Sequence, residues 1–105
     1  MTNNIAVLGL GIHQLNSIRY LKRYYDIIGF DEDVNCPGKK YVKKFFCLGL
    51  NKKEKILGIC KKNNIKFAAT FCNEHFLRLT SHINGKLGLE NHSKLLKLIS
   101  NKYLY

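Results

Sequence analysis

Two glycines, Gly9 and Gly11, are the residues whose type and spacing most directly indicate chemistry. They follow a short apolar run at residues 5–8 and precede apolar residues at helical spacing. Glycine lets a ligand approach the backbone closely, so a Gly-x-Gly turn between a strand and a helix is typical of phosphate binding. Asp31 lies 20 residues after Gly11, where a carboxylate could accept hydrogen bonds from ribose hydroxyls. The pattern therefore favours a nucleotide or dinucleotide site.

The dinucleotide pattern is incomplete at one position. Gln14 stands where the third glycine of Gly-x-Gly-x-x-Gly allows the helix to pack closely against the strand. A Gly-x-Gly turn without that glycine is as often only a tight turn, and Asp31 is then a solvated residue at the end of a strand. Both interpretations stay open at this level. His13, inside the turn, is expected to point to solvent.

Four short apolar runs alternate with helical patterns along the chain. The runs predicted to be strands are residues 5–8, 25–30, 45–50 and 67–72. The segment 35–44 contains the only proline and predicts a loop with at most one helical turn. Because the runs are too apolar to alternate between core and solvent, they predict a mainly parallel sheet with helices on both faces. We therefore expect an α/β fold of three layers, Rossmann-like, with about four strands.

Cap residues set the predicted helix boundaries. Asn51 with Glu54 has the form of a reciprocal N-terminal capping box, and that helix is expected to end near residues 63–64. Asn73 is expected to cap the next helix, and Ser93 a last one. In a parallel sheet, ligands bind beyond the carboxyl ends of the strands. The candidate site is therefore the group of loops at residues 9–14, 31–38, 49–51 and 72–75.

Length and composition limit the class of protein. The 105 residues, 46% of them hydrophobic, suit one domain spanning residues 1–105. No apolar run approaches the roughly 18 residues of a membrane span, and the first residues lack the blocks of a signal peptide. A cytoplasmic location without a membrane partner is expected. Four cysteines without a Cys-x-x-Cys pair predict buried free thiols, and the four histidines do not converge, so no metal is expected.

The formal net charge of +11 raises the question of nucleic-acid binding, because clustered cations release counterions when they neutralise phosphates. Only three of the 18 basic residues are arginines, and the lysines are spread over polar helix faces and one loop. The chain is also rich in Asn and Ile, so a general bias in composition accounts for the charge. The sequence favours a solvated basic surface, and nucleic acid is not expected as a partner.

The chain as a whole resembles the N-terminal, pre-ATP-grasp domain of ATP-grasp ligases. This family includes the carbamoyl-phosphate synthases, the biotin carboxylases and the purine-biosynthetic carboxylate-amine ligases. The resemblance covers nearly the entire chain, and the order and spacing of its motifs carry it. The motifs are GLGIHQL at residues 9–15, IIGFDEDVNCPGKKYV at 27–42, TFCNEH at 70–75, and LGLENHS at 87–93 followed by NKYL at 101–104.

The resemblance implies a parent enzyme that uses ATP and Mg to convert a carboxylate into an acyl-phosphate, which an amine then attacks. In that family the N-terminal domain contacts the small-molecule acceptor substrate and forms one wall of the cleft. By position, Gly9, Gly11 and Gln14 match the family's first Gly-rich loop, and Glu74 matches a carboxylate after the fourth strand. An equally open interpretation of Glu74 is stabilisation of a first helical turn. Asp31 completes the expected substrate-binding set.

Nothing in the sequence resembles the central and C-terminal ATP-grasp regions, which carry the phosphate-binding lysine and the Mg-binding carboxylates. We therefore expect a fragment whose catalytic region is absent, with no catalytic residue and no cofactor of its own. Its expected partners are the acceptor substrate, the missing ATP-grasp region and, through exposed apolar side chains near residues 103–105, a second copy of the chain. The alternative function is a stand-alone nucleotide- or NAD(P)-binding Rossmann domain.

Overall fold

The computed structural model describes residues 3–72 and 74–89 of the chain. Strands and helices alternate throughout this part of the sequence. The strands are β1 (Asn4–Leu8), β2 (Asp26–Asp31), β3 (Lys44–Cys47) and β4 (Ala68–Thr70). The α-helices are α1 (Leu15–Lys22), α2 (Lys53–Lys62) and α3 (Glu74–Lys86). Three short 3-10 helices join them, namely η1 (Ile12–Gln14), η2 (Pro37–Tyr41) and η3 (Leu50–Lys52).

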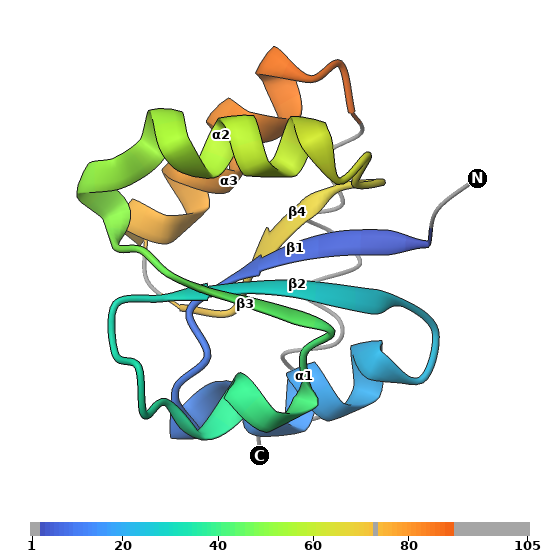
Figure 1. Cartoon of the computed structure of the whole chain (residues 1–105), viewed down its shortest axis with the longest axis vertical. Helices are drawn as coiled ribbons and strands as arrows, with labels where there is room; N and C mark the ends of the chain where they lie inside the picture. The colour runs from blue at the N-terminus through green and yellow to red at the C-terminus, as the bar shows by residue number, and fades with distance from the viewer. Residues whose placement is uncertain (1–2, 73, 90–105) are drawn as a thin grey trace.

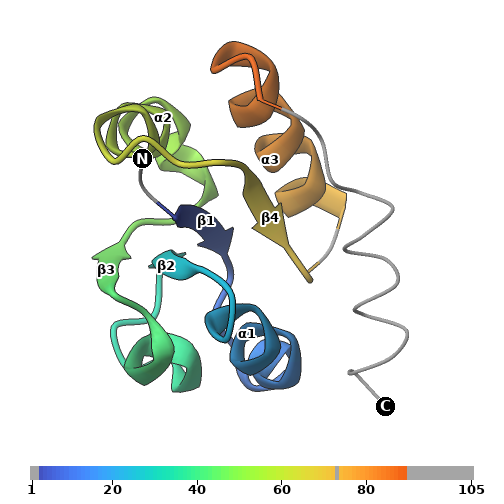
Figure 2. The ribbon, with the colours of Figure 1, turned by 90° about the vertical axis from the view of Figure 1, so that its right-hand side faces the viewer.

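All four strands are parallel and form one sheet in the order β3-β2-β1-β4. Helix α1 and η2 cover one face of the sheet, and α2 and α3 cover the other (Figures 1 and 2). The predicted Rossmann-like α/β architecture, with a parallel sheet between two helical layers, is confirmed.

Strand β1 shows why both faces are covered. Its five residues are all buried, and successive side chains point to opposite faces of a sheet. Ile5 and Val7 belong to the core under α1, whereas Ala6 and Leu8 belong to the core under α2 and α3. Each fully buried Ile or Leu contributes roughly 1.5–3 kcal/mol, so the strand stabilises both layers at once.

A side chain closes the outer edge of β4. The backbone N–H of Ala68 donates to Oδ1 of Asn84 at 2.7 Å, and Nδ2 of Asn84 donates to the carbonyl of Ala68 at 3.1 Å. Asn84 is buried in α3. Its carboxamide therefore takes the place of the peptide group that a fifth strand would offer at this position.

Two predicted boundaries are wrong. Strand β3 was expected over residues 45–50 but ends at Cys47, because the N–H of Leu48 turns back to the carbonyl of Phe46 at 3.0 Å. The capping box predicted from Asn51 does not form. The chain enters α2 through η3, in which the N–H of Lys52 donates to the carbonyl of Gly49 at 3.0 Å, and no side chain caps α2.

Other boundaries agree with the sequence more closely. Helix α2 ends at Lys62, and Asn64 follows with a positive φ of 50°, so the predicted end near residues 63–64 is confirmed. The predicted strand over residues 67–72 is present but is three residues long, and η2 is five residues long, more than the single turn expected. The predicted cap at Asn73 and the last helix lie outside the described residues.

All four cysteines are free, but they differ in burial. Cys36 and Cys60 are buried, Cys72 is half-buried, and Cys47 is exposed. The prediction of buried thiols is therefore wrong for Cys47, because β3 is an edge strand that ends there. Burial raises the pKa of Cys60 to about 12. Among the helices that the structure describes, none is long and apolar enough to cross a bilayer.

Candidate functional site

The candidate site lies at the carboxyl edge of the sheet, between β1 and β4. The chain moves from β1 to β2 to β3 on one side and then crosses over to place β4 on the other side of β1. This is the topological switch point, where ligands bind in parallel α/β sheets. In such sheets the ligand occupies a crevice at this point, and here the residues that follow β1 and β4 are the ones that would line it.

Gly9 must be glycine for two independent reasons. Its φ is +89°, a backbone conformation that side chains strongly disfavour. A Cβ at this position would lie 2.3 Å from Sγ of Cys72. Its N–H donates to the carbonyl of Phe30 in β2 at 2.8 Å, which fixes the start of the turn against the neighbouring strand.

Gly11 differs from Gly9, because its backbone is extended, with φ −73° and ψ 173°. A Cβ here would lie 2.9 Å from Oε1 of Gln14, the end of a flexible side chain. The N–H of Gln14 also donates to the carbonyl of Gly11 at 3.0 Å. The structure thus brings these two predicted site residues together, with a carboxamide beside the turn. Glycine at position 11 is therefore not required by the backbone conformation, but its missing side chain lets a ligand approach the backbone closely.

Asp31 binds the turn directly. Its Oδ2 accepts the backbone N–H of Leu10 at 2.8 Å, and its Oδ1 accepts the N–H of Asp33 at 2.9 Å. The carboxylate is half-buried at the end of β2, so it is held against the turn and is not merely a solvated strand end. Each carboxylate oxygen has a second lone pair, which leaves Asp31 able to accept from a ligand hydroxyl or amine.

The peptide groups around Leu10 are held from both sides. While its N–H is bound by Asp31, its carbonyl accepts the N–H of Gly38 at 2.8 Å. A Cβ on Gly38 would lie 2.8 Å from that carbonyl oxygen, so only glycine allows η2 to approach this closely. Leu10 and Gly38 therefore fix the shape of the turn, although neither was singled out as a candidate from the sequence. The Pro-Gly pair after the acidic cluster was the only signal.

Thr70 and Cys72 form the opposite wall of the crevice. The hydroxyl of Thr70 donates to the carbonyl of Leu8 at 2.7 Å and accepts the N–H of Cys72 at 3.2 Å. Burial raises the pKa of the Cys72 thiol, the Thr70 hydroxyl partly offsets the rise, and the negative charge of Asp31 adds to it. Cys72 is therefore a neutral thiol near neutral pH rather than a nucleophile. Both side chains lie in a predicted strand, which gave no signal of this role.

Glu74 and His13 lie outside this hydrogen-bonded cluster. Glu74 is exposed in the first turn of α3, where a negative charge is favourable to the helix dipole. Among the described residues, the hydrogen bonds that fix the turn come from Asp31 and Gly38, not from Glu74. His13 is exposed in η1, as expected from the sequence.

Exposed aliphatic side chains surround the crevice. Each lies in the segment that follows a different strand, so together they form what we call the apolar rim. The rim consists of Ile12 (66% exposed), Val34 (50%), Leu50 (37%) and Leu77 (43%). Segment η1 contacts η2, and α3 contacts η3, so neighbouring segments of the rim are joined in pairs. Large exposed apolar patches mark interaction sites in soluble proteins, so this edge is a candidate docking surface.

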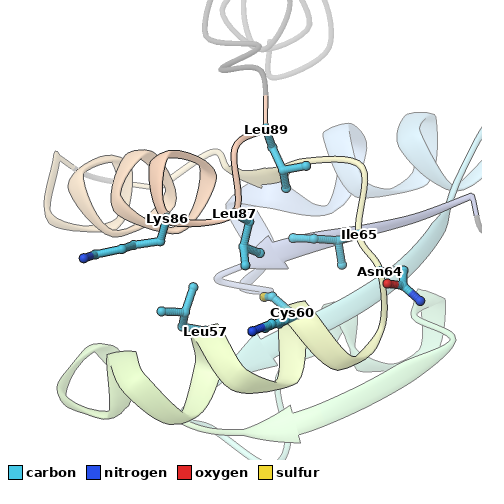
Figure 3. Close-up of a pocket in the computed structure, with 8 residues that line it drawn as sticks. Leu57, Cys60, Asn64, Ile65, Lys86, Leu87 and Leu89 are labelled. Atoms are coloured by element: carbon cyan, nitrogen blue, oxygen red, sulfur yellow. The ribbon is translucent and has the colours of Figure 1, made fainter.

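A second hollow, of about 450 Å³, lies between the ends of α2 and α3 and away from the carboxyl edge (Figure 3). Leu57, Cys60, Ile65 and Leu87 form most of its wall, and Lys86 extends away from them. Lys61, Asn64 and Lys86 also line this hollow. The carboxyl edge, however, carries the Gly-rich turn and lies at the topological switch point, so we treat that edge as the candidate site.

No protein-family model matches the sequence, and no curated protein matches it. The fold is similar to that of phosphoribosylglycinamide synthetase from Anaerococcus prevotii, with a TM-score of 0.72 and 18% identity over 86% of this chain and 23% of that chain.

Two further solved structures are similar in fold. UDP-glucose 4-epimerase from Thermotoga maritima, solved with UDP-glucose, has a TM-score of 0.62 and 12% identity, over 82% of this chain and 35% of that chain. The dTDP-glucose 4,6-dehydratase from Bacillus anthracis, solved with NAD, has a TM-score of 0.60 and 21% identity, over 80% of this chain and 34% of that chain. The chain thus spans between 23% and 35% of the length of these three proteins. At such identities the similarity establishes a Rossmann-like α/β fold.

Proposed function

We propose that this chain is the substrate-side N-terminal domain of an ATP-dependent carboxylate-amine ligase and is not catalytic by itself. The observation that carries the proposal is the carboxyl edge, where Asp31 holds the Gly-rich turn in place and the exposed side chains of the apolar rim follow the strands. A cleft between two domains needs such a rim, because the second domain covers it. The similarity in fold to phosphoribosylglycinamide synthetase and the order of the sequence motifs support the same function.

The crevice offers groups suited to a polar acceptor substrate. The Gln14 carboxamide has both donors and an acceptor, and it lies beside the accessible backbone of Gly11. Asp31 has lone pairs left for an amine or hydroxyl, and Glu74 offers a second carboxylate at the start of α3. In this proposal, Gln14 and the turn bind a substrate phosphate or carboxylate, while Gly9 fixes the geometry of the turn.

ATP and Mg belong to the parent enzyme in this proposal. Among residues 3–72 and 74–89, no group of three or more His, Cys, Asp or Glu side chains is arranged to hold a metal ion. The described residues therefore give no fit for Mg, and we assign them no step toward ATP. Their task is to bind and orient the acceptor.

Binding of a phosphorylated sugar tests the crevice. Ribose 5-phosphate should bind weakly, in the millimolar range, and shift the backbone amide signals of residues 9–14 in NMR titrations. Gln14→Ala should weaken this binding, whereas Asn16→Ala, an exposed amide on α1, should leave it unchanged. Amide shifts confined to other parts of the domain would contradict the proposal.

The apolar rim can be tested separately. At high concentration the chain should self-associate through the rim, and Ile12→Ser with Leu77→Ser should lower the association measured by sedimentation velocity. Tyr24→Ser is the matched control, since Tyr24 is 53% exposed but lies outside the rim. Equal effects of the rim and control substitutions would show that the rim is not a docking surface.

A stand-alone nucleotide- or NAD(P)-binding domain is the second candidate. The contact between Asp31 and the Gly-rich turn favours it, as does the similarity in fold to a dehydratase solved with NAD. Gln14 argues against it, because it stands where the dinucleotide pattern has a third glycine for close packing of the helix against the strand. Micromolar affinity for NAD in calorimetry, lost in Asp31→Asn, would favour this function over the ligase domain.

A further inference from the structure

The fold gathers basic residues that are far apart in the sequence. Arg19 and Lys22 lie three residues apart on α1, so they share one face of the helix. Lys40 comes from η2, which packs beside α1 on the same face of the sheet (Figure 2). All three cations converge on the ring of Tyr41. The distances to the ring centroid are 6.0 Å for Cζ of Arg19, 5.6 Å for Nζ of Lys22 and 5.3 Å for Nζ of Lys40.

Among the residues that the structure describes, no ion pair joins any of these three cations to a carboxylate. Since each lies within 6.0 Å of one ring centroid, any two are at most about 12 Å apart, close to the Debye length of about 10 Å at 0.1 M salt. Within the described part of the chain, the ion pair that forms joins Lys43 to Asp26 at 3.8 Å. Three mutually repelling cations without a carboxylate partner favour an anionic ligand.

Surface hollows extend the cluster in two directions. One hollow, of about 170 Å³, lies near the start of β2 and is lined by Lys22, Lys40 and Tyr41, together with Asp26 and Lys43, which pair with each other. A shallower one lies on the other side of η2 and is lined by Lys39 and Lys40, next to the loop that follows β2. Lys40 borders both hollows. A ligand that follows η2 can therefore contact cations along its length, which favours an extended polyanion over a single phosphate.

Aromatic rings accompany the charges. Lys39 lies 5.0 Å from the ring centroid of Phe45. At the end of α1, Tyr24 is 53% exposed, and Cζ of Arg23 lies 6.0 Å from its ring centroid. Exposed aromatic rings beside Lys and Arg are how proteins bind single-stranded nucleic acids, because phosphates meet the cations and bases stack on the rings.

We propose that this surface, the Tyr41 patch, binds single-stranded nucleic acid. The patch comprises Arg19, Lys22, Arg23, Tyr24, Lys39, Lys40 and Tyr41. The cations bind successive phosphates without reading the sequence, and Tyr24 provides a stacking surface for a base. The proposal departs from the expectation that nucleic acid is not a partner. That expectation rested on composition and on lysines assigned to separate helix faces and one loop, whereas the fold brings cations of α1 and η2 to one ring. It is independent of the ligase proposal, since none of these residues belongs to the crevice.

Fluorescence anisotropy with labelled single-stranded oligonucleotides tests the patch on the whole chain. We expect binding to both oligo(U) RNA and oligo(dT) DNA, weakening steeply between about 50 and 200 mM salt. Arg19→Gln with Lys22→Gln and Lys40→Gln removes three phosphate contacts. The slope of log affinity against log salt should then fall by about 2, since each contact with a single strand contributes about 0.7. Tyr24→Ala should weaken binding roughly fivefold or more.

The matched control removes the same charge elsewhere. Lys52→Gln with Lys53→Gln and Lys55→Gln changes three exposed lysines at the start of α2, on the other face of the sheet. This variant should keep most of the binding and of the salt slope. Equal losses in both triple variants would overturn the proposal, because net charge alone would then explain binding. Binding to phosphatidylserine vesicles without binding to either oligonucleotide would overturn it too, and would identify a membrane surface as the partner.

Discussion

The contact between Gly9 and Cys72 makes a quantitative prediction about stability. Gly9→Ala places a Cβ in a left-handed backbone conformation, which costs roughly 1–2 kcal/mol. It also forces the new methyl group against Sγ of Cys72 at 2.3 Å, and overpacking of this kind costs roughly 1–3 kcal/mol more. The substitution should therefore lower the free energy of unfolding by about 2–5 kcal/mol.

The two contributions can be separated in a second background. In Cys72→Ala the sulfur is gone, and the nearest remaining side-chain atom, Cβ of residue 72, lies 3.7 Å away, at an ordinary contact distance. Gly9→Ala should then cost only the backbone contribution, about 1–2 kcal/mol. A double-mutant cycle should thus give a coupling energy of about 1–3 kcal/mol between the two positions.

Urea unfolding followed by far-UV circular dichroism measures these values, since the chain has no Trp to report by fluorescence. Gly58→Ala is the matched control. Gly58 lies in α2, and nothing stands within 4 Å of its Cβ position, so alanine should stabilise the helix by roughly 0.5–1 kcal/mol. A cost of Gly9→Ala that is the same with and without the Cys72 thiol would refute the proposed contact.

Three further predictions follow from single interactions. Asp31→Ala should destabilise the chain by about 2 kcal/mol and speed hydrogen exchange at Leu10, whose N–H loses its acceptor, while Asp31→Asn should cost less. Asn84→Ala should lower the free energy of unfolding by about 3 kcal/mol, because it leaves the buried N–H and carbonyl of Ala68 without partners. Hydrogen exchange at the Ala68 N–H should become faster. If this N–H stayed protected from exchange, the edge closure would be contradicted. Because burial raises the pKa of Cys60 to about 12, the thiol ionises at a lower pH in the unfolded state than in the folded state as the pH rises. Stability should therefore fall between pH 9 and about 12, less so in Cys60→Ala, as measured by urea midpoints.

Apolar patterning predicted the order of strands and helices because β1, β2 and β4 are largely buried and β3 carries two half-buried phenylalanines. Boundaries were harder, since backbone turns end β3 and start α2. The N–H of Leu48 and that of Lys52 each bond to a nearby carbonyl, and such bonds leave no trace in side-chain chemistry. The capping box at Asn51 was a reasonable interpretation of the sequence, but a 3-10 turn, in which the N–H of Lys52 donates to Gly49, forms there instead.

The candidate site was predictable only in part. Spacing alone identified Gly9, Gly11 and Asp31, but it treated the two glycines alike, although only Gly9 has a left-handed backbone. The roles of Gly38 and Thr70 depend on backbone atoms of β1 and of its turn, far away in the sequence. Contacts of this kind appear only when the strands are placed side by side.

The Tyr41 patch shows that the clustering of charges, too, could not be predicted from the sequence. The sequence assigned its basic residues to polar helix faces and one loop, and it gave no sign that Arg19 and Lys40, 21 positions apart, lie together. Packing of η2 against α1 brings them to one ring. Charge patterning predicts surface chemistry only within one element, where neighbours in space are also neighbours in sequence.

The carboxamide of Asn84 has a consequence for how this domain meets other chains. An unpaired sheet edge is a template on which another molecule can add a strand, and repeated addition leads to fibrils. At one edge of this sheet Asn84 already occupies the pairing groups of Ala68, and at the other edge Lys44 is exposed on β3. Association by strand addition is thus disfavoured at both edges. A domain of this kind can be grafted between other domains with less risk of amyloid-like assembly.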